Sequence, residues 1–389
     1  MNDFSTDTLA APARAAHDDR SGWLMYHSVG VYPGHQQAMA EALTTFADYW
    51  GAADEHRWDQ ALSSRASLLA DWAGLIGARA QDVFGAQNVT EAFARFLDGL
   101  NDAVLRSKTV LVAADCFPSL HFLLHGEARR RGFAVRTVPV REGKCYVLDE
   151  DFIDAWRDDV ALALITWVSS LTSKRVDLGA MREHALRTGS LVALDVTQGI
   201  GILPFDLRET PFDFVCGSTL KWLCGAPGTG LGYVAPHLMA QGMEPSVRGW
   251  FSQDDPFNWN LERFAYAPDA RRFDTGTPSV LPFIASLPGM RWVRTQPAGK
   301  LRAHNLALCH TLMALLDEKG YTLLSPRTDD ERGASVMARV PSHLDPEQIV
   351  RELGEAHLFV DARDRTIRLS PGTCTTAAGL ERLARCLPR

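Results

Sequence analysis

The chain lacks the features that mark several large classes of protein. Its 389 residues carry 40 Lys and Arg against 47 Asp and Glu, a net charge of -7, so there is no basic character suited to nucleic acid or an anionic membrane. No apolar run approaches the length of a membrane span, and residues 1–20 hold several aspartates but no long apolar core, so we expect no secretory signal. Small-molecule chemistry is the class of function that these absences favour.

Disulfide, metal and nucleotide patterns are missing as well. The seven cysteines are odd in number and include no CxxC pair, which indicates reduced thiols and a cytoplasmic protein. The twelve histidines show no metal-ligand spacing such as HExxH, so no metal site is expected. The glycine-rich stretch 225–232 has neither GxxxxGK[ST] nor GxGxxG spacing, and a strand-like segment follows it, which excludes a Walker or Rossmann loop.

The order of apolar segments predicts an α/β fold. Hydrophobic residues make up 46% of the chain, enough for a large core. Between about residues 60 and 235, expected helices alternate with expected strands at 110–114, 133–140, 162–167, 191–195 and 212–216. Such alternation is typical of a mostly parallel sheet with helices on both faces, and ligands then bind at the carboxyl ends of the strands.

The pattern changes after residue 288 and predicts a second, smaller domain. A long helix is expected over 290–319, followed by short strand-like segments at 335–340 and 366–369, which together indicate an α+β unit. We predict an N-terminal segment, 1–50, that packs on the small domain, a large cofactor-binding domain, 51–283, and a small C-terminal domain, 284–389.

Two residues of opposite charge are expected at the same edge of the large sheet. Lys221 lies between an apolar segment and the glycine-rich stretch, and Asp195 ends the apolar run 191–195. An aldehyde cofactor needs a lysine amine, and a buried carboxylate keeps a pyridinium nitrogen protonated. The pair therefore predicts pyridoxal phosphate, although a surface lysine and a strand-end cap are the alternative roles.

Other residues could hold the phosphate and the ring of that cofactor. Val89 and Thr90 stand where a helix begins, and Ser218 adds a hydroxyl three residues before Lys221. Phe117 follows the strand expected at 110–114 and could stack on the pyridine ring, although a core phenylalanine is the alternative.

Arginine is the side chain best suited to a substrate carboxylate. Arg368 lies on the apolar segment 366–369, where a solvated arginine would be unexpected, so we assign it to substrate binding together with Ser28. Arg363 and Arg365, on a charged turn nearby, are alternatives.

Residues 26–387 resemble the fold-type I pyridoxal phosphate enzymes of the class V aminotransferase group, and most of all kynureninases. In that family an aspartate and, three residues later, a histidine or glutamine precede the Schiff-base lysine, as Asp195, Gln198 and Lys221 do here. The sequence 116–119, Cys-Phe-Pro-Ser, is similar to the family motif whose phenylalanine stacks on the cofactor.

Two further motifs extend the resemblance and imply a homodimer. Trp250 lies in a Gly-Trp-Phe motif whose indole binds the phosphate in kynureninases, and Thr277 lies in the segment 273–278, which resembles one that reaches the partner's phosphate. Arg368 matches the family's carboxylate-binding arginine. The resemblance implies an obligate homodimer with active sites at the subunit boundary.

The departures from kynureninase lie on the substrate side of the site. Leu220 stands where kynureninases carry a tyrosine that contacts the phosphate and assists proton transfer, Gln253 replaces a histidine, and 372–374 replaces a Tyr-Asn pair. The loop 169–173 also lacks the histidine or asparagine expected beside the ring. The leading hypothesis is kynureninase-like lyase or hydrolase chemistry on an α-amino acid. Transamination or other α-carbon chemistry, such as epimerisation, decarboxylation or deamination, is the alternative, cysteine desulfuration is less favoured, and a cofactor-binding protein without activity is a third reading.

Overall fold

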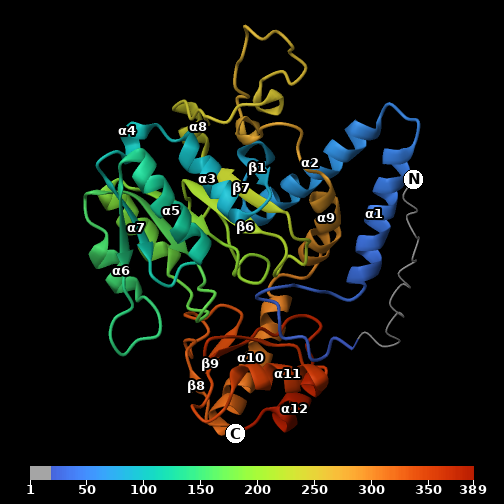
Figure 1. Ribbon diagram of the computed structural model, residues 1–389, viewed down its shortest axis with the longest axis vertical. Coiled ribbons are helices and arrows are strands. Elements are labelled where there is room, and N and C mark those ends of the chain that lie inside the picture. Colours follow the sequence, from blue (N-terminus) through green and yellow to red (C-terminus); the bar gives the residue numbers. More distant parts are fainter. Residues whose placement is uncertain (1–18) are drawn as a thin grey trace, which may run out of the picture.

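The fold is seen in a computed structural model, in which residues 19–389 are described. A seven-stranded sheet forms the centre of its larger part, in the order β1-β7-β6-β5-β4-β2-β3 (Figure 1). Only β7 runs against its neighbours, β1 and β6, and the other pairs are parallel. The strands are β1 Val83–Ala86, β2 Thr109–Ala113, β3 Ala134–Val138, β4 Val160–Thr166, β5 Leu191–Asp195, β6 Phe214–Ser218 and β7 Gly230–Val234.

Helices cover both faces of this sheet because its central strands are apolar on both sides. One hydrophobic cluster joins the sheet to α2, α6, α7 and α9, through residues such as Trp72 and Met181, and another joins it to α3, α5 and α8 through residues such as Phe93 and Leu124. The helices of this part are α1 His35–Gly51, α2 Arg57–Ile76, α3 Val89–Gly99, α4 Asp102–Leu105, α5 Pro118–Arg131, α6 Asp149–Ala155, α7 Leu178–Thr188, α8 Pro236–Ala240 and α9 Leu281–Arg294, with short 3-10 turns η1 Ala80–Asp82, η2 Trp250–Ser252 and η3 Ala270–Phe273.

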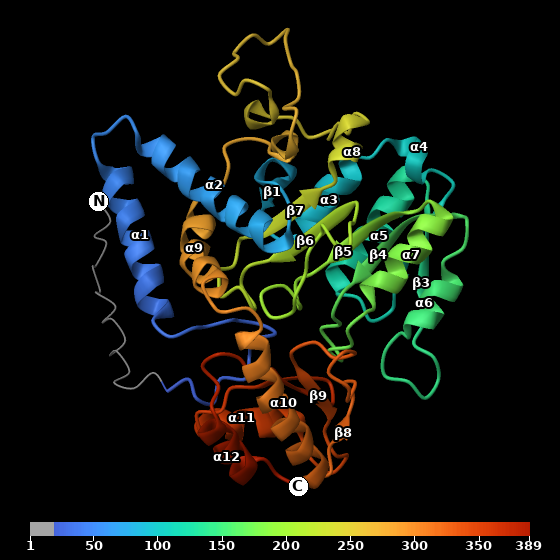
Figure 2. The same ribbon diagram turned by 180° about the vertical axis from the view of Figure 1, so that it is seen from behind.

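A second sheet, antiparallel and four-stranded in the order β10-β11-β9-β8, lies at the opposite end of the molecule from the segment between α8 and α9 (Figure 2). A separate hydrophobic cluster packs it against three helices. Residues Trp23 and Met25 pair with Phe359 and Ser370, so the start of the described chain runs along this sheet. The elements are α10 Lys300–Glu318, β8 Thr322–Leu323, β9 Val336–Arg339, α11 Pro346–Glu355, β10 Asp361–Arg363, β11 Thr366–Leu369 and α12 Ala377–Cys386.

The predicted fold class is confirmed, and one element was predicted wrongly. The expected strands match β2, β3, β4, β5 and β6 to within two residues at each end. The single helix expected over 290–319 is instead α9 and α10, because Pro297 and Gly299, with a φ of 74°, interrupt the helix between them. The division at residue 284 stays a prediction, and α9 spans that boundary.

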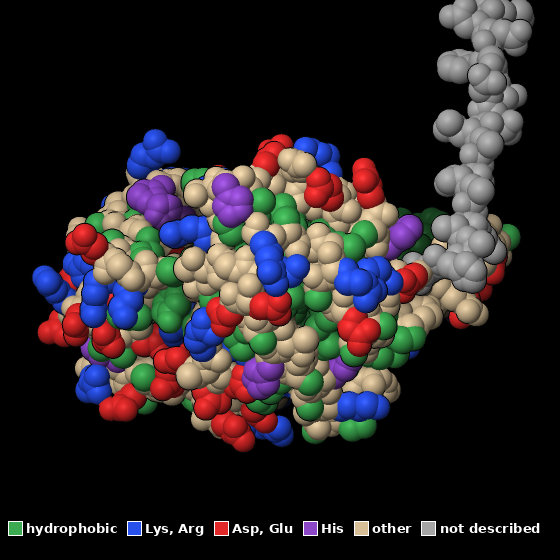
Figure 3. Space-filling model, turned by 90° about the horizontal axis from the view of Figure 1, so that it is seen from below, with side chains coloured by type: hydrophobic (Ala, Val, Ile, Leu, Met, Phe, Trp, Pro, Cys, Tyr) green, Lys and Arg blue, Asp and Glu red, His purple; other side chains and the backbone are tan. Residues whose placement is uncertain are grey.

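Acidic and basic side chains are interspersed over the face shown in Figure 3, without a basic patch. No helix within residues 19–389 is long and apolar enough to cross a membrane. Over the same residues, no group of three or more His, Cys, Asp or Glu side chains could hold a metal ion.

Candidate active site

The site is built on the carboxyl ends of the central strands. Asp195, the last residue of β5, pairs in register with Thr166 on β4 and Cys216 on β6. Ser218, which ends β6, pairs with Gly230 on β7, and Gly230 pairs with Ala86, which ends β1. The register therefore places the loop after β6, the end of β5 and the start of α3 along one edge of the sheet.

Lys221 lies half-buried in the loop after β6, against an aromatic ring from the loop after β2. Its Nζ is 5.6 Å from the centroid of the Phe117 ring. Burial lowers the pKa of Lys221 to about 8, the charge of Arg368 acts in the same direction, and Asp195 opposes both. Within residues 19–389 no carboxylate forms an ion pair with this ammonium, so the amine is available near neutral pH.

Asp195 is almost fully buried beside that lysine. Its Oδ1 accepts a hydrogen bond of 2.9 Å from the backbone N–H of Thr197. Burial raises the pKa of Asp195, while the hydrogen bonds from Thr197 and the charge of Lys221 act against the rise. A buried carboxylate with few partners gains most from a cationic ring nitrogen placed next to it.

The start of α3 offers free backbone donors at the same edge. Asn88 caps the helix by accepting from Glu91 N at 2.9 Å, and Glu91 in turn accepts from Gln87 N. In the described part of the chain, the N–H groups of Val89 and Thr90 have no acceptor. Such a helix start attracts an anionic group. The buried Ser218 lies at the same edge of the sheet, at the end of β6, which only β7 separates from β1.

A segment near the start of the chain crosses the Lys221 loop. Gly30 N donates to Leu220 O at 2.9 Å, and a Cβ on Gly30 would lie 1.7 Å from Lys221 O. Gln198 donates through Nε2 to His27 O at 3.1 Å, so the same segment is also joined to the end of β5. Ser28 is half-buried in this segment, and its backbone N–H bonds to Met25 O.

The small sheet contributes Arg368, whose guanidinium is already paired. Asp361 stands opposite Arg368 in the β10–β11 hairpin, and its carboxylate accepts from Nε at 2.7 Å and from Nη2. His27 Nε2 lies 3.0 Å from Asp361 Oδ1. Neither His27 nor Asp361 was predicted from the sequence. A signal for Asp361 was present, because two strand segments joined by a short charged turn favour a hairpin. Of the alternatives, Arg365 donates to backbone carbonyls of the 340–344 turn. Arg363 is exposed, and its Nη2 lies 3.8 Å from Asp361 Oδ2.

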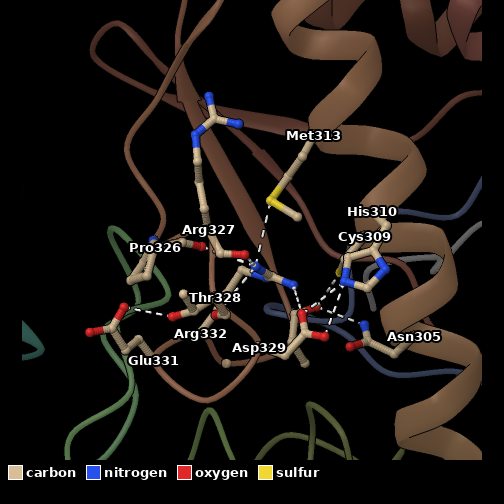
Figure 4. A network of polar contacts seen from close by, with 12 residues as sticks. Asn305, Cys309, His310, Met313, Pro326, Arg327, Thr328, Asp329, Glu331 and Arg332 are labelled. Atoms are coloured by element: carbon tan, nitrogen blue, oxygen red, sulfur yellow. Dashed lines mark hydrogen bonds and ion pairs between the residues drawn. The ribbon is translucent and has the colours of Figure 1, made fainter.

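The loop 169–175 is hydrogen-bonded both to the loop after β2, where Ser169 Oγ donates to Asp115 O at 3.4 Å, and to the small sheet. Arg368 Nη1 donates to Ser170 O at 3.4 Å. The backbone of Lys174 also forms an isolated antiparallel β-bridge with that of Arg332. Arg332 is fully buried, and its guanidinium donates to the carbonyls of the 326–328 turn and to Asp329 (Figure 4). This network fixes the turn on which the loop rests.

Two predicted residues lie outside the strand ends and loops described above. Trp250 and Thr277 belong to the segment between α8 and α9, which projects from the end of the molecule remote from the small sheet (Figures 1 and 2). A buried ion pair anchors this segment, with Arg65 Nη2 donating to Asp274 Oδ1 at 2.7 Å. The roles of Trp250 and Thr277 stay predictions that require a second subunit.

The residues that the structure does bring together suit pyridoxal phosphate. An amine with a lowered pKa faces an aromatic ring, a buried carboxylate lies next to the amine, and uncapped N–H groups begin a helix on the same edge. Lys221 would hold the aldehyde carbon, Asp195 the ring nitrogen, Phe117 the ring face, and the start of α3 the phosphate. Each group of the cofactor thus finds a matching side chain or backbone donor.

Known proteins resemble this chain over most of its length. The chain is 28% identical to a kynureninase from Deinococcus radiodurans over 92% of its own length and 88% of the relative's. It is 26% identical to an uncharacterized aminotransferase, YcbU, from Bacillus subtilis over 74% of this chain and 75% of that one. A cysteine desulfurase from Thermococcus onnurineus NA1 shares the fold, with a TM-score of 0.81, 17% identity, and coverage of 96% of this chain and 98% of that chain.

A family model settles the relationship. The model described as "Aminotransferase class-V" matches residues 36–370, which include every site residue named above except those of the segment that crosses the Lys221 loop. The protein is a pyridoxal phosphate enzyme and belongs to the class-V aminotransferase family.

Proposed function

We propose that the protein cleaves the side chain of an α-amino acid by kynureninase-like lyase or hydrolase chemistry, at the Cβ–Cγ bond or a related one. The observation that carries the proposal is the position of the Lys221 amine, which faces the Phe117 ring and feels the charges of both Asp195 and Arg368. An amino acid whose carboxylate is bound by Arg368 would present its α-carbon to this amine. The kynureninase relatives support the choice of reaction.

Each side chain has a definable task in this reaction. When bound, pyridoxal phosphate supplies an aldehyde that condenses with amines and a ring that withdraws electrons from the α-carbon. Lys221, with a pKa of about 8, can accept and return the α-proton near neutral pH. Arg368 binds and orients the carboxylate, Asp195 keeps the ring nitrogen protonated, and Phe117 excludes water from one ring face.

Leu220 is the observation that supports the alternative, a reaction confined to the α-carbon. Kynureninases carry a proton-shuttling tyrosine at this position, and leucine can neither donate nor accept a proton. Transamination, epimerisation, decarboxylation or deamination would not need that hydroxyl, and the YcbU relative bears an aminotransferase name. Cysteine desulfuration has less support, because Cys374 lies in a hydrogen-bonded turn and its N–H donates to Tyr26 Oη at 2.9 Å.

The reaction is tested by product analysis on the cofactor-loaded enzyme. Incubation with kynurenine or 3-hydroxykynurenine should release alanine, and Lys221→Ala should abolish this release while leaving the fold intact by circular dichroism. Transfer of the amino group to an added keto acid, without alanine from kynurenine, would favour the alternative. If the cofactor-loaded protein shows no visible absorbance, or if borohydride does not attach the cofactor covalently to Lys221, both candidate reactions are contradicted.

We propose further that the working unit is a cytoplasmic homodimer. The helix α1 has no buried residue although it carries Leu43, Phe46 and Trp50, and Trp259 and Leu261 are among the most exposed apolar side chains. A second subunit would cover such surfaces and receive Trp250 and Thr277 at its own Lys221. Mixing Lys221→Ala chains with Trp250→Ala chains should restore activity that neither has alone. Light scattering checks that the mixed chains are dimeric. If such dimers recover no activity, the proposal that the two subunits share active sites is contradicted.

A further inference from the structure

The pairing of Arg368 leaves only one part of its guanidinium free for a substrate. A guanidinium has five N–H groups, one on Nε and two on each terminal nitrogen. Asp361 takes the Nε–H and one N–H of Nη2, the side edge of the fork. Two of the three remaining hydrogens lie on the end edge formed by Nη1 and Nη2, and the third is the other hydrogen of Nη1. Within the described chain, the only further contact of these hydrogens is the long one from Nη1 to Ser170 O. That end edge can still bind a carboxylate through two parallel hydrogen bonds.

Asp361 is itself held from behind by a buried chain of hydrogen bonds. His27 Nε2 contacts Asp361 Oδ1 at 3.0 Å, His27 Nδ1 contacts Ser370 Oγ at 2.7 Å, and Ser370 Oγ contacts Ser335 Oγ at 2.6 Å. His27, Ser370 and Ser335 are all buried.

The direction of this chain follows from the carboxylate at its end. A carboxylate only accepts, so His27 Nε2 carries the hydrogen, and Nδ1 then accepts from the Ser370 hydroxyl. Neutral His27 satisfies the arrangement, and burial lowers the pKa of His27, which favours that neutral form. Asp361 is thus held by the imidazole at Oδ1 and by the Arg368 guanidinium at both oxygens, while the exposed Arg363 makes only a longer contact of 3.8 Å to Oδ2.

We propose that Asp361, oriented by His27, is the positioning residue that turns the end edge of Arg368 toward the substrate and so makes the site selective for amines that carry a free α-carboxylate. Asp361 acts through Arg368 and need not touch the substrate. The inference deepens the proposed function, since it assumes an amino-acid substrate, and it does not depend on which bond is broken afterwards.

Selectivity can be measured without knowing the reaction. L-Alanine and L-alaninamide differ in the carboxylate alone, and each is titrated into the cofactor-loaded enzyme while the visible absorbance of the cofactor is followed. In the wild type, alanine should half-saturate at a much lower concentration than the amide. Asp361→Ala should raise the half-saturating concentration of alanine by about tenfold or more, because Arg368 is no longer oriented to make charge-assisted hydrogen bonds to the carboxylate. The half-saturating concentration of the amide should stay within about twofold of the wild-type value. An equal change for both probes, or no change for alanine, would overturn the proposal.

Three variants separate positioning from general damage. Asp361→Glu keeps the carboxylate and should recover part of the preference, and His27→Ala should lower the preference less than Asp361→Ala does. Arg339→Ala, an exposed arginine on the neighbouring strand β9, should leave it unchanged. A loss of preference in Arg339→Ala as large as in Asp361→Ala would show that the small sheet, rather than Asp361, is responsible.

A crystal structure provides a readout that does not require substrate. In cofactor-loaded Asp361→Ala, the Arg368 guanidinium should rotate away from the orientation that points its end edge at the site, and an unchanged orientation would overturn the proposal. If the wild-type absorbance responds to no amino acid while Arg368 does rotate in the variant, the proposed function fails and the positioning role stands.

Discussion

Lys221 Nζ lies 5.6 Å from the centroid of the Phe117 ring, although two strands, β4 and β5, separate the strands that lead to these residues. The contact is made because all four strands end at the same edge and their loops turn over it. Parallel strands thus assemble a site from residues far apart in the sequence. The ring and the amine define the two sides between which the cofactor would bind.

Replacing Phe117 should weaken cofactor binding more than folding. An aromatic contact contributes about 0.5–1.5 kcal/mol beyond its buried area, so Phe117→Ala should raise the dissociation constant of pyridoxal phosphate by roughly three- to tenfold or somewhat more. Titration of the stripped protein by absorbance measures this. Phe122→Ala is the matched control, because Phe122 lies on α5, the helix that Phe117 precedes, and is 72% exposed. Equal weakening in both variants would contradict a stacking role.

Lys221 should make the stability of the cofactor-free protein depend on pH. Burial lowers the folded pKa of Lys221 from 10.5 to about 8, so between these values the unfolded chain binds more protons and the free energy of unfolding rises with pH. Lys221→Met should therefore be more stable than wild type below about pH 8, and the difference should fade as the pH approaches 10.5.

Urea unfolding at several pH values tests this dependence. The exposed Lys144 provides the control, because Lys144→Met should leave the pH profile parallel to that of wild type. A constant difference between Lys221→Met and wild type from pH 7 to about 10.5 would contradict a depressed lysine pKa.

The parts of the fold and site that could be predicted are those encoded locally. The apolar runs ending at Asp195 and before Lys221 reveal strands and their carboxyl ends, and parallel pairing then brings those ends together. The break between α9 and α10 is encoded locally as well, by Pro297 and Gly299. The apolar spacing on either side of these residues favoured one continuous helix, and that prediction was wrong.

The rest depends on contacts between distant segments. His27 meets Asp361 only because the start of the described chain runs along the small sheet, which no spacing within either segment indicates. The pairing of Asp361 with Arg368 depends on the register of a hairpin, and a shift by one residue would place the two on opposite faces. Trp250 and Thr277 came from family resemblance, and their place at the site stays a prediction.

Restoring a tyrosine at position 220 should increase any kynureninase activity. Leu220 is half-buried next to Lys221, and its carbonyl accepts a hydrogen bond from Gly30 N. Leu220→Tyr adds a hydroxyl that can transfer a proton, and general acid–base groups contribute typically a hundredfold or more, so a gain of about tenfold in kcat on kynurenine is expected from an unoptimised hydroxyl. Leu220→Phe has the ring without the hydroxyl and should show no gain. Equal rates in the two variants would contradict Leu220 as the cause of divergence.

Breaking the buried pair between Arg65 and Asp274 should destabilise the protein strongly. Both side chains are buried, and removing one partner leaves an uncompensated charge, which costs about 3–5 kcal/mol. Asp274→Ala should lower the free energy of unfolding by about that amount and release the segment that bears Thr277. As a control, Arg208→Ala removes an exposed ion pair with Asp206, and it should change the free energy of unfolding by less than about 1 kcal/mol. Similar losses in the two variants would contradict the special role of the buried pair.

A methyl group at position 30 should disturb Lys221 from behind. The Cβ of an alanine there would lie 1.7 Å from Lys221 O and 3.1 Å from the sulfur of Cys224, and the first of these contacts is with backbone, so the loop itself must move. Overpacking of this kind costs typically about 1–3 kcal/mol, and the movement displaces the amine from the Phe117 ring. Gly30→Ala should therefore lower both the thermal midpoint and the affinity for pyridoxal phosphate.

The control for this substitution is Gly51→Ala at the end of α1, where a new Cβ meets nothing within 4 Å. Alanine there should leave the cofactor affinity unchanged and stability the same or slightly higher, because alanine favours helices over glycine. If Gly30→Ala lowers stability but leaves cofactor affinity at the wild-type value, the segment that crosses the loop supports the fold without positioning Lys221. If affinity falls in Gly30→Ala alone, the close approach of Gly30 is what holds the amine in place.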